Sequence, residues 1–138
     1  MLGRFKKPEV PLRVGLGLMY IYSGIDLVRH PTGWKWAITS LPQGLQDLIA
    51  SLPLSLQNLT NTASGWEAFL KLQGIGELII AAILLFWFLP KWTLKLVAFV
   101  ITVEMAMILW LVDINLSTFR DIGLLGAGAA LLLIAYKK

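Results

Sequence analysis

Residues 73–90 form an apolar run that is long enough to cross a lipid bilayer as a helix. The run reads QGIGELIIAAILLFWFLP, and about 20 such residues, each rising about 1.5 Å, span the hydrocarbon core. Its one charged residue is Glu77. Because an ion is poorly solvated in hydrocarbon, an acid at this depth needs a proton, a partner or a wet cavity. This acid is therefore the first clue to function.

The composition of the whole chain is typical of a membrane protein. Of its 138 residues, 57% are hydrophobic and 14% are charged, and the mean hydropathy is +0.74. A soluble domain of this size needs a larger polar surface. With no cysteine and one histidine, His30, a single chain has no disulfide, no thiolate nucleophile and no multi-histidine metal site. We expect neither a metal centre nor a nucleic-acid partner, since the basic residues cluster at the ends of apolar runs.

We predict an all-α fold, an integral membrane four-helix bundle with antiparallel up-down topology in a single domain, residues 1–138. Each span should be helical because backbone polar groups in lipid must be satisfied internally. The first apolar run follows basic residues, as in a signal peptide. It is longer than a signal core and no small-x-small cleavage site follows it, so we predict a retained span. The predicted spans are 12–28, 66–89, 93–112 and 120–136, with Pro90 stopping the second.

The distribution of lysine and arginine predicts that both termini lie in the cytoplasm. Positive charge is concentrated on the side of the membrane that retains it during insertion. One side of the predicted bundle has Arg4, Lys6, Lys7, Arg13, Lys91, Lys95, Lys137 and Lys138, and the other has Arg29, Lys35, Lys71 and Arg120. We expect an integral protein of a prokaryotic cytoplasmic membrane.

The connection between the first two spans, residues 30–65, contains a short tandem repeat. SLPQGLQDL begins at Ser40 and SLPLSLQNL begins at Ser51. In each unit the serine can cap a helix, the proline fits a first helical turn, and leucines recur at helical spacing. We predict two short amphipathic helices in the outer interface, near Trp34 and Trp36. They act either as a connector that hides its own leucines or as a lid over the bundle.

Two carboxyl groups fall at similar depth on consecutive predicted spans. Glu77 lies about 16 Å along the second span from Trp66, and Glu104 lies about 16 Å along the third span from Thr93, at about 1.5 Å per residue. Short connections make these helices antiparallel neighbours. We therefore expect the two acids at one level of the bundle, where close approach would favour sharing one proton.

Polar and small residues form inward-facing stripes beside these acids. Gln73, Glu77 and Ala81 share one face of the second span, and Arg13, Gly17, Tyr20 and Gly24 share one face of the first. The predicted buried polar core consists of Arg13, Tyr20, Gln73, Glu77 and Glu104. These groups either fix helix register by satisfying one another or serve a function, which is the default hypothesis for acids at the bilayer midplane.

Charged residues also gather toward the outer end of the predicted bundle. Asp26 and Arg120 form a predicted ion pair there, with Asp121 next to it. The fourth span that follows is rich in residues that let a neighbouring backbone approach closely. These small residues are Gly123, Gly126, Ala127, Gly128 and Ala130.

Three segments resemble spans of the DoxX-like family of four-helix integral membrane proteins. LRVGLGLMYIYSGIDL, GIGELIIAAILLF and RDIGLLGAGAALLL are similar to its first, second and fourth spans, so the resemblance covers most of the chain except residues 30–65. Arg13, Glu77 and Asp121 match family-signature positions, whereas Asp26 stands where the family often has lysine. The resemblance implies kinship with subunits of membrane redox complexes, among them the membrane subunit of a thiosulfate:quinone oxidoreductase.

Three functions remain open at this point. The favoured one is a small non-catalytic membrane subunit of a larger complex, redox or energy-converting, with a quinone or lipid held near the buried polar core. The second is a quinone-reactive oxidoreductase subunit of the thiosulfate:quinone type, in which Glu77 and Glu104 carry protons. The third is a small ion or proton transporter. We expect other membrane-protein subunits as partners and no covalently bound cofactor.

Overall fold

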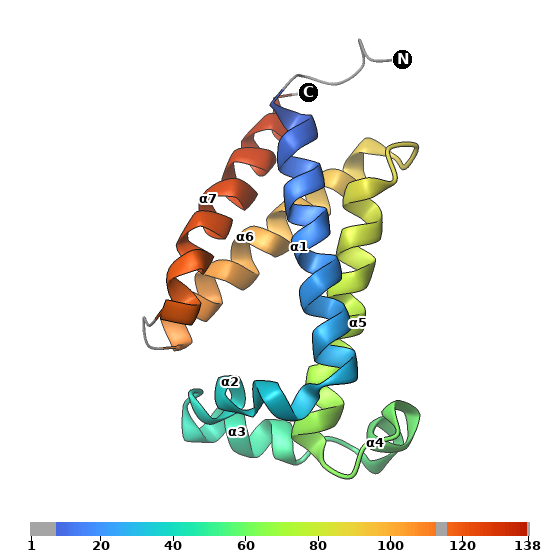
Figure 1. Ribbon diagram of the computed structural model, residues 1–138, viewed down its shortest axis with the longest axis vertical. Coiled ribbons are helices and arrows are strands. Elements are labelled where there is room, and N and C mark those ends of the chain that lie inside the picture. Colours follow the sequence, from blue (N-terminus) through green and yellow to red (C-terminus); the bar gives the residue numbers. More distant parts are fainter. Residues whose placement is uncertain (1–7, 113–115, 138) are drawn as a thin grey trace. The chain divides into compact units, whose positions relative to one another are not determined.

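The computed structural model describes residues 8–112 and 116–137, and for residues 116–120 it describes the backbone only (Figure 1). This part of the chain is all helical, which confirms the predicted all-α class. The elements are α1 (Glu9–Arg29), the 3₁₀ helix η2 (Pro31–Trp34), α2 (Lys35–Thr39), α3 (Gln43–Ala50), α4 (Leu54–Thr60), α5 (Gly65–Leu85), α6 (Lys91–Leu111) and α7 (Leu116–Tyr136).

Each predicted span overlaps one of the four long helices, α1, α5, α6 and α7. The largest differences are at helix ends. We predicted that Pro90 stops the second span, but α5 already ends at Leu85. Pro90 is instead the N-cap of α6, with φ −56° and ψ 145°. Proline suits the start of a helix because its missing N–H would have no partner there.

Helices α5 and α6 are long and apolar enough to cross a membrane. The 18-residue windows on which this rests have mean hydropathies of 1.9 and 2.1. The apolar part of α7 is shorter and covers Asp121–Tyr136. Within the described ranges, no other helix meets the same test of length and composition.

Contacts divide the chain into two compact units. The first consists of Met1–Tyr20 and Ile79–Lys138, and the second of Ile21–Leu78. In the first unit, α6 and α7 run side by side (Figure 1). Their contact depends on Gly128, where an added Cβ would lie 2.9 Å from Cγ2 of Ile101. Among the described residues, Gly123 and Gly126 have no such neighbour within 4 Å, so there the predicted close approach along this helix is found at Gly128 but not at these two glycines.

In the second unit, α1 and α5 approach closely at a pair of glycines. A Cβ added at Gly24 would lie 2.8 Å from the carbonyl oxygen of Gly74, and a Cβ added at Gly74 would lie 2.8 Å from that of Gly24. In the same unit, a buried apolar cluster joins four helices and packs α2 and α3 against α1 and α5. It consists of Leu27, Ile38, Ile49 and Leu70, with Trp34, Leu41, Trp66 and Phe69 packed around it.

The tandem repeat builds the same local structure twice, which confirms the two predicted short helices as α3 and α4. Pro42 and Pro53 are the two N-caps, with nearly identical dihedral angles. The glutamine four residues after each proline donates from Nε2 to the carbonyl just before that proline, Gln46 at 2.7 Å and Gln57 at 2.9 Å. The repeated glutamine thus closes each turn by satisfying a carbonyl that the helix leaves exposed.

The serines of the repeat do not begin these helices, and our prediction that they cap them was wrong. Ser40 is the C-cap of α2 and Ser51 is the C-cap of α3. Their hydroxyls donate to Trp36 O at 2.7 Å and Leu48 O at 2.8 Å, which lie in the helix that has just ended. Trp36 O also accepts the backbone N–H of Ser40 at 3.0 Å, so each serine closes the helix that precedes it.

Candidate functional site

Arg13 is buried at the C-terminal end of α5, within the first unit. It is 6% exposed. Its Nε donates to the carbonyl oxygen of Leu84 at 2.7 Å, and its Nη2 donates to that of Ile83 at 3.3 Å. The last carbonyls of a helix have no partner inside the helix. Arg13 therefore caps α5 from a different helix, and its positive charge meets the negative end of the helix dipole.

Glu9 completes this arrangement and is a residue that the sequence analysis missed. It is 1% exposed, and its Oε1 lies 3.4 Å from Nη1 of Arg13. The indole ring of Trp87 lies 5.7 Å from the guanidinium carbon of Arg13, and its Nε1 donates to Leu84 O at 3.2 Å. The available signal for Glu9 was its position four residues before Arg13, where side chains on one helix face meet.

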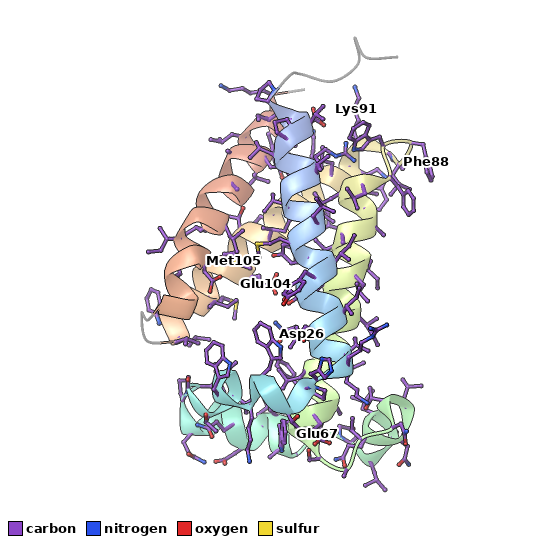
Figure 2. The ribbon with its side chains drawn as sticks, viewed as in Figure 1. Asp26, Glu67, Phe88, Lys91, Glu104 and Met105 are labelled. Atoms are coloured by element: carbon purple, nitrogen blue, oxygen red, sulfur yellow. The ribbon has the colours of Figure 1, made fainter. Side chains whose placement is uncertain are left out.

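A cavity of about 290 Å³ adjoins this buried pair. We call it the corner cavity, because it lies at the turn that joins α5 to α6. It is lined from the start of α1, the turn, the start of α6 and the end of α7. Figure 2 marks the turn with Phe88 and Lys91, both of which line it. The other lining residues that bear on its chemistry are Glu9, Arg13, Trp87 and Thr93.

Tyr20 and Glu104, two members of the predicted buried core, are brought together by α1 and α6. The hydroxyl of Tyr20 donates to Oε2 of Glu104 at 2.8 Å. Tyr20 is almost fully buried, and Glu104 is half-buried on α6 (Figure 2). A phenol and a carboxyl in hydrogen-bond contact can hold and exchange a proton.

Glu77 and Gln73 lie one helical turn apart on α5, in the second unit. Glu77 is buried, and Nε2 of Gln73 donates to its Oε1 at 3.5 Å. Of the predicted stripe, Glu77 and Ala81 are buried and Gln73 is half-buried. The predicted approach of Glu77 to Glu104 stays a prediction, because the two acids belong to different units.

Asp26, a member of the predicted outer group, contacts two residues of its own unit. Asp26 Oδ2 accepts a hydrogen bond from Nε1 of Trp34 at 2.7 Å, and its Oδ1 lies 3.1 Å from Nδ1 of His30. The side chain of Arg120 lies outside the described residues, so its pairing with Asp26 stays a prediction. Asp121 is buried at the start of the apolar part of α7.

Among the described residues, no group of three or more His, Asp or Glu side chains is placed to hold a metal ion. Comparison with protein-family models, with curated proteins and with solved structures found no match to this chain. The resemblance to the DoxX-like family therefore stays a prediction.

Proposed function

We propose that this chain is a small non-catalytic integral membrane subunit of a larger membrane complex, with α1, α5, α6 and α7 as its four spans. The supporting observation is how little of its most apolar helices is buried. Only 33% of the apolar window of α5 and 28% of that of α6 are buried within the chain. The core helix of a soluble protein passes the same hydropathy test but buries most of its surface. Exposed apolar surface on this scale calls for lipid or protein neighbours.

The distribution of exposed residues along α6 supports the same proposal. Every exposed residue from Trp92 to Trp110 is apolar, and large side chains such as Phe99 and Met107 are about half exposed. The acid of this helix, Glu104, is directed toward Tyr20 instead. A hydrocarbon solvent favours this arrangement, in which apolar side chains face outward and polar groups face the interior of the protein.

The exposed face of α7 that carries Gly123 and Gly126 supports the proposal that the chain is a subunit of a larger complex. Gly123 and Gly126 are exposed, and a Cβ at either would meet no atom of the described part of the chain within 4 Å. In membranes, helices associate through small residues that let backbones approach closely. A helix of a partner subunit would fill this face. The redox or energy-converting character of the complex rests on the family resemblance.

Purification of the tagged chain from native membranes in mild detergent tests the proposal. We expect it to migrate as part of a larger assembly. Gly126→Leu should weaken that assembly, because the leucine occupies the space of a partner helix. Gly15→Leu is the matched control, since Gly15 is also an exposed helical glycine with no atom within 4 Å of its added Cβ. Recovery of the wild-type chain as a free monomer would count against the proposal.

The Tyr20–Glu104 hydrogen bond favours a quinone-reactive subunit as the second candidate function. Here the pair would supply a proton to a quinone oxygen while a partner subunit supplies electrons. Glu104→Gln is expected to slow quinone reduction by the intact complex about 10²-fold or more, the usual effect of a general acid. Thr102→Val is the control, because its hydroxyl on the same helix bonds only Ala98 O in the described contacts. Unchanged turnover in Glu104→Gln would remove this candidate.

A further inference from the structure

We propose that the corner cavity binds the phosphate headgroup of an anionic phospholipid. The choice of lipid rests on the proposed membrane insertion, which puts the turn between α5 and α6 at the level of the headgroups. The site lies entirely within the first unit, and none of the acids of the predicted midplane core line it. It is therefore separate from any quinone site at Tyr20 and Glu104.

The charge of the cavity lining favours an anion. Arg13 and Lys91 supply two cations, and among the described lining residues Glu9 supplies the acid. Glu9 lies against Arg13, so the ammonium of Lys91 contributes the remaining formal charge. The positive end of the α6 dipole lies at the same place, since α6 begins at Lys91. A phosphodiester there would accept hydrogen bonds from the ammonium of Lys91, while the hydroxyl of Thr93 donates to the carbonyl oxygen of Pro90 at 2.6 Å.

The size and the apolar rim of the cavity favour a lipid as the source of that phosphate. About 290 Å³ corresponds to the volume of about ten water molecules, at about 30 Å³ each. Trp87, Phe88 and Leu89 line one side, and Phe88 is 81% exposed. Trp92, which follows Lys91 in the chain, is also exposed. Aromatic side chains gather at the headgroup level of a bilayer, so acyl chains could leave the cavity along this apolar rim.

The predicted topology puts this cavity on the side of the membrane that holds most of the lysine and arginine. Basic pockets between helices on the cytoplasmic side are known binding sites for anionic headgroups. Lys91 suits a test because it is exposed and has no other role in the described contacts, whereas Arg13 caps α5. Lys95 is a suitable control, since it lies on the same helix, its Nζ is 5.2 Å from the ring of Tyr136, and neither residue is among those that line the cavity.

The experiment uses the full chain reconstituted in phosphatidylcholine vesicles that contain a minor fraction of brominated lipid. The readout is tryptophan quenching, and the difference between wild type and Trp87→Phe isolates the signal of Trp87. We expect brominated phosphatidylglycerol to quench Trp87 more strongly than brominated phosphatidylcholine. Lys91→Gln should reduce this preference about fivefold, the effect of one lysine near an anionic surface, and Lys95→Gln should leave it unchanged.

Alkaline extraction of the same vesicles separates the two ways in which the proposal can fail. Equal quenching by the two lipids in a chain that resists extraction would overturn the lipid site and leave membrane insertion standing. A chain that is extracted would overturn the proposed function as well. If inorganic phosphate abolished the preference at constant ionic strength, the cavity would be a site for soluble phosphate, which also overturns the proposal.

Discussion

Arg13→Gln is expected to lower the free energy of unfolding by about 3–5 kcal/mol, the usual cost of removing one partner from a buried ion pair. Glu9, at 1% exposed, would lose the guanidinium that lies 3.4 Å from its carboxylate. The carbonyls of Ile83 and Leu84 would lose their donors at the same time. A buried carbonyl without a donor adds its own desolvation cost.

Equilibrium unfolding in detergent micelles, with helical circular dichroism as the readout, measures this loss. Arg29→Gln is the matched control, because it removes the same charge from an exposed position in the last turn of α1. The double variant Glu9→Gln with Arg13→Gln should recover part of the loss, since it removes both buried charges. An Arg13→Gln variant as stable as Arg29→Gln would show that the cap does not support the fold.

Gly74→Ala is expected to be less stable than Gly76→Ala by about 1–3 kcal/mol, the usual cost of overpacking. The two glycines lie on the same helix, α5, two residues apart. At Gly74 the added Cβ would lie 2.8 Å from the carbonyl oxygen of Gly24 and 2.9 Å from Cβ of Leu27. Backbone atoms cannot move aside cheaply, so α1 and α5 would have to separate.

Gly76 is the matched control, because an added Cβ there meets no atom within 4 Å. Replacing a helical glycine by alanine in open space stabilises a helix by up to about 1 kcal/mol. We therefore expect opposite signs for the two substitutions, measured by the same unfolding assay. Equal stability of the two variants would mean that α1 and α5 do not meet at Gly24 and Gly74.

Helical periodicity predicted the long helices and much of what is buried. The stripe of Arg13, Gly17, Tyr20 and Gly24 is buried at all four positions. It could be predicted because a polar or small residue that recurs at i, i+4, i+7 and i+11 among apolar ones defines one face of a helix. The hydrogen bond from Tyr20 to Glu104 could not be predicted in this way, because it depends on the rotation of α6 about its own axis relative to α1.

The features that sequence reasoning missed depend on how helices begin and end. Glu9 follows a basic segment and was not singled out, yet it is buried against Arg13. Pro90 reads as the end of one helix and is the N-cap of the next. Ser40 and Ser51 precede prolines as typical N-caps do, but each ends the preceding helix. In each case a tertiary or backbone partner decides between two locally acceptable arrangements.

The central claim, that the apolar faces of α5 and α6 contact acyl chains, is most directly tested by site-directed spin labelling. The chain has no native cysteine, so single cysteines at Ile79 on α5, Val103 on α6 and Lys137 after α7 can each be labelled specifically. All three positions are exposed. In reconstituted vesicles, we predict that nitroxides at Ile79 and Val103 collide more often with oxygen than with a water-soluble nickel complex, and that the label at Lys137 does the reverse. Preferential collision of the nickel complex at Ile79 and Val103 would contradict the account.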